Sequence, residues 1–114
     1  MIKGSELLTN CVKEIQALAS GLEAKYGTIV ITSGYRSPEY NAKVGGSPNS
    51  QHIKGKAIDV YVPNVSPIKV CAWVLDNFKN IHGFGLAIYQ GYCHFDCRDG
   101  ANVYWIYGKD GKVA

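Results

Sequence analysis

The chain has 114 residues, a length that suits one domain, and 46% of them are hydrophobic, which is enough to build a core without external staples. Twelve Lys and Arg against nine Asp and Glu give a net charge of +3, without the concentrated basic stripe of a nucleic-acid-binding protein. No apolar run approaches the roughly 18 residues of a membrane-spanning helix, and the first residues do not resemble a signal peptide. We therefore expect a monomer that is made in the cytoplasm and binds neither membranes nor nucleic acids.

Helical periodicity dominates the first part of the chain. Apolar residues recur at helical spacing from Leu8 to Leu22. Ser5 is a suitable N-cap, and Gly27 suits the left-handed residue that follows a helix. The pattern predicts one long amphipathic helix over about 5–25.

Two strands and a long loop come next. The β-branched, apolar segment 28–32 predicts one strand, and 57–62 predicts another. Between them lies the irregular stretch 33–55, which contains several Gly and Pro residues. An unstructured loop of that length is uncommon in a compact domain and is usually functional.

The second half begins with a helix and continues as strands. Ser66 and Pro67 open the helix, because proline at the first helical position loses no hydrogen bond. Its buried face is predicted to contain Val70, Cys71, Val74, Leu75 and Phe78. Three strands are predicted at 83–89, 92–98 and 102–107. Asp99-Gly100 is a hairpin signal between the last two strands. This order predicts a single α+β domain, 1–114, with helices packed on a mostly antiparallel sheet.

The chain contains four thiols and no CxxC pair, which argues against a four-cysteine zinc site. They are Cys11, Cys71, Cys93 and Cys97. Four cysteines can pair in three ways, between which the sequence does not choose. Because Cys11 and Cys71 fall on apolar helix faces, we expect reduced thiols throughout.

Strand alternation brings polar side chains to one face of the predicted sheet. His94 and Asp96 share a face opposite an apolar set in one strand, and Asp59 does the same in another. His52 comes from the loop just before. Two imidazoles and a carboxylate suit Zn²⁺, and three protein ligands leave an open fourth position, as in catalytic sites. From spacing alone, ordinary hydrogen-bonded histidines, with Asp96 paired to an arginine, remain an alternative.

Several motifs in this order resemble the zinc D-alanyl-D-alanine carboxypeptidase family. They are Ser33-Gly34-Tyr35-Arg36-Ser37, Asn41, Val44-Gly45-Gly46, Ser50-Gln51-His52, Gly55, Asp59 and His94-Phe95-Asp96. Relatives of that family include phage endolysins, bacterial murein endopeptidases and proteins with the hedgehog-type fold. The resemblance covers about 33–105 and implies a fold of this type.

The resemblance also implies a role for individual residues. It makes His52, Asp59 and His94 the ligands of one zinc ion per chain. It makes Arg36 a contact to the peptide substrate, with a structural salt bridge to Asp59 or Asp96 as the alternative. Ser50 or Gln51 would add hydrogen bonds to the substrate.

One departure concerns the general base. Many relatives carry a catalytic Glu or Asp three residues before the last zinc-binding His, where this chain has Gly91, and some carry another His at the position of Tyr92. We expect Asp96 to act as the base, or else to support His94 or Arg36 as a neighbouring group. His82 is a further candidate for the base, although a structural role is favoured for it. For Trp105 and Tyr107, packing in the core is favoured over a position in the substrate groove.

These features predict zinc-dependent hydrolysis of peptidoglycan stem or cross-bridge peptides, by a D-Ala-D-Ala carboxypeptidase or a murein endopeptidase. The small size fits a phage product that a lysis partner releases to the cell wall. Two alternatives stay open: a catalytically inactive zinc-containing module that binds the wall or a protein, and a metal-free interaction surface. The bond that is cut is not specified by the sequence.

Overall fold

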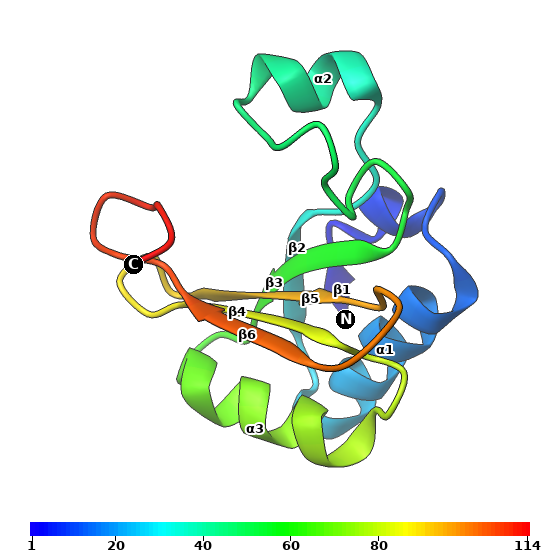
Figure 1. Ribbon diagram of the computed structural model, residues 1–114. Coiled ribbons are helices and arrows are strands. Elements are labelled where there is room, and N and C mark those ends of the chain that lie inside the picture. Colours follow the sequence, from blue (N-terminus) through cyan, green and yellow to red (C-terminus); the bar gives the residue numbers. More distant parts are fainter.

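A six-stranded mixed sheet forms the centre of the computed structural model, which describes residues 1–114 (Figure 1). The strands are β1 (Ile2–Lys3), β2 (Ile29–Ser33), β3 (Ala57–Tyr61), β4 (Gly83–Ala87), β5 (Tyr92–Asp96) and β6 (Val103–Ile106). Their order across the sheet is β1-β2-β3-β5-β4-β6. The three inner pairings are antiparallel, whereas the edge pairings β1–β2 and β4–β6 are parallel. The predicted α+β class is confirmed, and the sheet is mixed.

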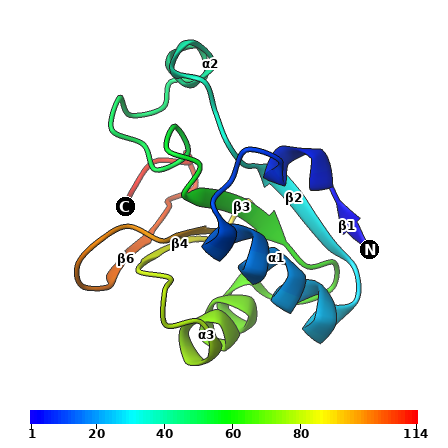
Figure 2. The same cartoon turned by 90° about the vertical axis from the view of Figure 1, so that its right-hand side faces the viewer.

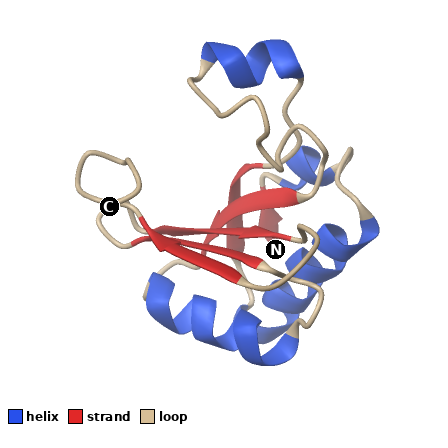
Figure 3. Ribbon diagram, viewed as in Figure 1, coloured by secondary structure: helices blue, strands red, loops and turns tan.

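The longer helices, α1 (Lys13–Tyr26) and α3 (Pro67–Asn77), cover one side of the sheet. The short α2 (Pro38–Lys43) and the loop after it stand on the other side (Figures 2 and 3). The sheet therefore has one face that is packed into a core and one that is free to carry a site.

No helix combines the length and apolar character needed to cross a membrane.

The alternation predicted for β3 and β5 is confirmed. Ile58 and Val60 of β3, with Cys93 and Phe95 of β5, are buried in the core under α1 and α3. The intervening residues, which include Asp59, point to the opposite face. Asp59, His94 and Asp96 thus lie on the side of the sheet opposite α1 and α3.

The start of α3 was predicted correctly, and its buried face only in part. The Ser66 hydroxyl accepts a hydrogen bond from the Lys69 N–H at 3.3 Å, as a capping residue does. Val70 and Val74 are buried, but Leu75 is 37% exposed. At about 100° per residue, Leu75 lies roughly 120° around the helix from the mean direction of the two valines, so it faces outwards.

The single helix predicted over 5–25 is wrong in its first part. A short 3₁₀ helix, η1 (Ser5–Leu8), is followed by a break, and α1 begins only at Lys13, with no side-chain cap from Ser5. The Val12 N–H donates to the Gly55 carbonyl at 2.9 Å instead of continuing the helix. A tertiary hydrogen bond from the long loop has replaced a helical one. The end is as predicted, at Gly27, with φ of 88°.

The predicted hairpin across Asp99-Gly100 does not form. The last strand, β6, pairs with β4 in parallel and lies beyond it from β5. Both edges of β5 are already occupied, by β3 and β4, so β5 offers no edge to a following strand. The strand β6 in the C-terminal part of the chain therefore lies beside β4, on the edge of β4 that faces away from β5.

Candidate metal centre

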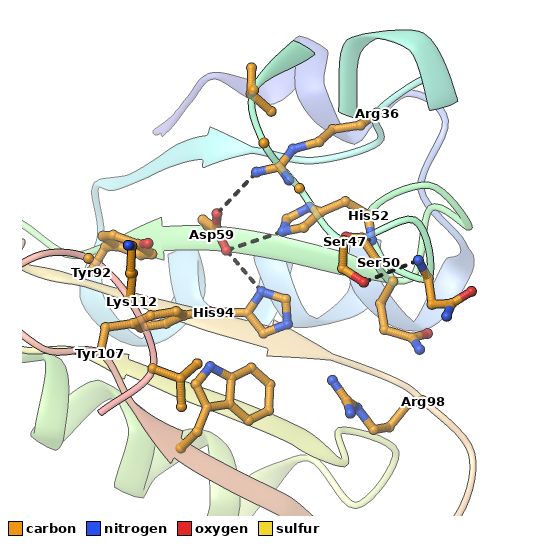
Figure 4. Close-up of a pocket in the computed structure, with 18 residues that line it drawn as sticks. Arg36, Ser47, Ser50, His52, Asp59, Tyr92, His94, Arg98, Tyr107 and Lys112 are labelled. Atoms are coloured by element: carbon orange, nitrogen blue, oxygen red, sulfur yellow. Dashed lines mark hydrogen bonds and ion pairs between the residues drawn. The ribbon is translucent and has the colours of Figure 1, made fainter. Parts of the chain in front are cut away.

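The three predicted ligands meet on the face of the sheet opposite α1 and α3 (Figure 4). Asp59 on β3 is the direct register partner of His94 on β5, and its Oδ1 lies 3.0 Å from His94 Nδ1. His52, at the end of the long loop, brings its Nε2 to 3.3 Å from the same oxygen. The three ligand atoms all lie within 4.8 Å of one another. Residues separated by 42 positions in the chain therefore offer their donor atoms to one point.

Each histidine ring is oriented by a second partner. His52 Nδ1 lies 2.8 Å from the Gly34 carbonyl, which only accepts, so Nδ1 carries a proton and Nε2 is the nitrogen that faces Asp59. His94 Nε2 donates to Asp96 Oδ2 at 2.7 Å, which leaves Nδ1 facing Asp59. Histidine ligands of metals are usually held in this way. The donor set and its outer partners fit a zinc ion.

Asp96 is completely buried and both of its oxygens are engaged. Arg98 donates from Nε to Oδ1 and from Nη2 to Oδ2, each at 2.8 Å, while Oδ2 also accepts from His94. Gly83 lies opposite on β4, and a Cβ atom there would collide with the Asp96 carboxylate. Asp96 is therefore paired with Arg98, not with Arg36, and it lies behind His94 instead of in the open space before it.

Electrostatics keep the two carboxylates ionised. Burial alone would raise the pKa of Asp59, but hydrogen bonds from His52 and His94 outweigh it and hold the pKa well below its ordinary value. Burial is likewise outweighed at Asp96 by Arg98 and His94, so its pKa is also lowered. For His94, burial lowers the pKa and the two carboxylates raise it more, for a net increase. The carboxylates thus favour a proton on His94, and a cation bound at the same place would compete with that proton.

Arg36 is held above the centre by the long loop. Its Nε donates to Ser33 Oγ and its Nη1 to Asn41 Oδ1, both at 3.2 Å. Asn41 is itself buried, and its Nδ2 donates to the Ser47 carbonyl at 2.8 Å. Arg36 Nη2 lies 3.9 Å from Asp59 Oδ2, a long contact beside the centre. The guanidinium is therefore fixed in position while it still lines the open space.

A cavity of about 720 Å³ opens over the three ligands. The loop 44–51 forms one wall, which includes Ser50 and Gln51. That these two residues bind the substrate stays a prediction. The Ser50 hydroxyl also accepts from the backbone N–H of His52 at 3.2 Å, which steadies the turn. His82 lines a separate, smaller cavity, where its ring nitrogens face two backbone carbonyls.

The opposite wall of this cavity comes from the C-terminal part of the chain. Trp105 and Tyr107 line it, so the favoured prediction of core packing is wrong for both. The Trp105 ring lies 5.2 Å from the ring of His94. A Cβ atom at Gly85 would come within 2.7 Å of the Trp105 Nε1, so the glycine leaves the space that the indole fills.

Tyr92 and Lys112 are among the lining residues that had not been selected from the sequence as site residues. Tyr92 precedes His94 by two positions, so strand alternation alone could have placed it on this face. Lys112 reaches the cavity because the chain after β6 turns back, with Val113 bridged to Tyr107. No local pattern predicts that return.

Residues 3–96 of the chain match the family model described as Peptidase M15. The matched range contains all three clustered ligands, Arg36 and Asp96. No curated protein is similar enough to the chain to count as a match. Because the family match covers most of the chain and the family's zinc-binding chemistry has a counterpart in the cluster, the chain belongs to the peptidase M15 family of zinc-dependent metallopeptidases.

Proposed function

We propose that the chain is a zinc metallopeptidase that hydrolyses peptide bonds of bacterial peptidoglycan, as a D-Ala-D-Ala carboxypeptidase or a murein endopeptidase. The observation that carries the proposal is the convergence of His52, Asp59 and His94 at the floor of an open cavity large enough for a peptide. Three ligands with space before them are typical of catalytic zinc sites. The cluster needs no second copy of the chain, so we propose that the monomer, with a hedgehog-type fold, is active.

The ligands are held before any substrate arrives. Gly34 fixes the ring of His52, and Asp96 fixes the ring of His94, so His52 Nε2 and His94 Nδ1 point to the same place. Asp59 adds one negative charge. A zinc ion bound there would supply a Lewis acid for the scissile carbonyl and would lower the pKa of a bound water to about 7.

Arg36 is the residue best placed to hold the peptide. Ser33 and Asn41 fix the guanidinium and leave it against the cavity beside Asp59. A planar guanidinium pairs with a carboxylate or donates to a carbonyl with defined direction. Ser50 and Gln51, on the adjoining wall, are proposed to add hydrogen bonds to the peptide backbone.

For Asp96 we propose a positioning role rather than that of general base. Its two oxygens are occupied by Arg98 and His94, and its carboxylate is shielded from the cavity. A base must reach the proton that it removes, within hydrogen-bond distance or through one water. Asp96 therefore acts through His94, whose ring it orients and makes a better ligand.

A second candidate function follows from the same observation. Asp59 is the one carboxylate that lines the cavity, and Gly91 occupies the place where many relatives carry the catalytic acid. A zinc-containing module that binds the wall or a protein without cutting it would have the same cluster.

Digestion of purified peptidoglycan separates the two functions. The zinc-loaded protein is incubated with the polymer and the fragments are analysed by mass spectrometry. The proposal predicts a new peptide terminus at one kind of bond, absent with the His52→Ala variant. Bound zinc together with an unchanged polymer would favour the non-catalytic module, and the cleaved bond distinguishes carboxypeptidase from endopeptidase.

A further inference from the structure

One wall of the cavity is built by the segment after residue 96, beyond the family match. Tyr107 and Val113 form a β-bridge, and the Gly108 N–H donates to the Lys112 carbonyl at 2.7 Å. Gln90, in the β4–β5 turn, donates from Nε2 to the Gly108 carbonyl at 3.0 Å. These bonds close the C-terminal loop and tie it to the sheet. The position of Lys112 is thus set by the backbone around it.

This wall offers hydrogen-bond donors and one free positive charge. Tyr92, Tyr107 and Lys112 line the cavity together, and Figure 4 shows Lys112 on the same side of it as the two tyrosines. Phenols are neutral donors at neutral pH. Lys112 forms no ion pair, in contrast to Arg98, which is paired with Asp96. No acidic residue from this segment lines the cavity, since Asp110 accepts from the Lys112 N–H at 3.0 Å outside it.

We propose that Tyr92, Tyr107 and Lys112 form a subsite for a carboxylate of the peptide substrate. The subsite rests on the proposed function, because its occupant is the peptide whose scissile bond lies at the metal centre. An ammonium group without a partner, beside two neutral donors, selects an anion over a neutral amide. Arg36 borders the cavity from the loop between β2 and α2, so the peptide would lie between two cationic groups.

A stem peptide carries two carboxylates of the kind that this subsite would bind. One is the terminal carboxylate of the last D-alanine, and the other is the α-carboxylate of the internal D-isoglutamate. Each can be replaced by a carboxamide, which has nearly the same size and no charge. Two matched pairs of synthetic peptides therefore distinguish the sources, and the pair that responds identifies the group bound at Lys112.

The test compares Lys112→Gln with Lys109→Gln as a matched control. Lys109 belongs to the same loop, but its Nζ lies 5.6 Å from the Tyr89 ring, and the residue does not line the cavity. Dissociation constants are measured by calorimetry on the full chain without metal, and kcat/KM on the zinc-loaded protein. Wild type and Lys109→Gln should prefer the free carboxylate in one pair by roughly 10- to 100-fold, the scale of one hydrogen bond to a charged group.

In Lys112→Gln, the preference in dissociation constant should fall to nearly one. A wild type without preference, or a Lys112→Gln variant that keeps it, would overturn the subsite. If the preference depends on Lys112 in the binding measurement but no peptide is cleaved by zinc-loaded protein, the subsite stands and the proposed peptidase activity fails. Equal melting temperatures of both variants ensure that a loss of preference does not reflect unfolding.

Discussion

Replacing Asp96 with Asn tests what holds His94 in place. The substitution keeps the shape of the side chain but removes its charge and turns one acceptor into a donor. If the remaining oxygen takes the place of Oδ2 and accepts from His94 Nε2, the new amide faces Arg98 Nε, which now lies 2.8 Å from Oδ1. One of the two partners must therefore lose its acceptor.

The expected cost falls mainly on metal affinity. Loss of an outer partner of a histidine ligand typically weakens metal binding by about 10- to 100-fold, which corresponds to roughly 1.4–2.7 kcal/mol. The free energy of unfolding should fall by about 1–3 kcal/mol, since a buried charged hydrogen bond is lost. Arg98 is partly exposed and can turn to water, which keeps this value below the cost of a fully buried unpaired charge.

The assay measures zinc affinity by competition with a chelator, and peptide hydrolysis as zinc is added. A positioning role predicts that Asp96→Asn regains activity in excess zinc. The control is Asp99→Asn, because Asp99 is exposed and its ion pair with Lys56 Nζ is long, at 4.0 Å; this substitution should leave stability nearly unchanged. Normal zinc affinity with turnover reduced about 10²-fold would refute the positioning role and make Asp96 the base.

Three further outcomes are expected. Metal analysis should find one zinc per chain, lost in His52→Ala and in His94→Ala and strongly weakened in Asp59→Ala; two tightly held ions would contradict the centre. Because the carboxylates raise the pKa of His94 above its ordinary value, calorimetry in buffers of different ionisation enthalpy should detect proton release on zinc binding near pH 7, and affinity should fall as pH decreases. Burial raises the pKa of all four thiols, that of Cys93 to about 12, so a reductant should leave activity unchanged; loss of activity with zinc still bound would show a required disulfide.

The clustering of His52, Asp59 and His94 could be predicted from the sequence because two of the three residues lie on strands. Alternation has a period of two, so the apolar residues around Asp59 and His94 decide which face each ligand takes. The direct pairing of these two residues across β3 and β5 is a matter of register, which alternation alone does not specify. The family motifs gave the order of these residues along the chain, and the structure adds the contacts that Gly34 and Asp96 make with the rings of His52 and His94.

The parts that were missed depend on contacts between distant segments. The break before α1 arises from a hydrogen bond between Val12 and Gly55, and the absent hairpin from occupied edges of β5. The local signals at these two places, a cap at Ser5 and a turn at Asp99-Gly100, were outweighed by contacts with distant segments. The helix α2 is a different case, since Ser37 caps it as Ser66 caps α3, and the same Ser-Pro signal was available in the sequence.

Metal removal and restoration, followed on peptidoglycan by mass spectrometry, tests whether cleavage depends on zinc at His52, Asp59 and His94. The protein is stripped with a chelator, returned to one equivalent of zinc and incubated with the polymer at each stage. We expect no cleavage after stripping and full recovery of cleavage at a single kind of peptide bond with one zinc per chain. Cleavage that survives stripping, or an intact polymer in the presence of one firmly bound zinc, would contradict a catalytic zinc held by His52, Asp59 and His94.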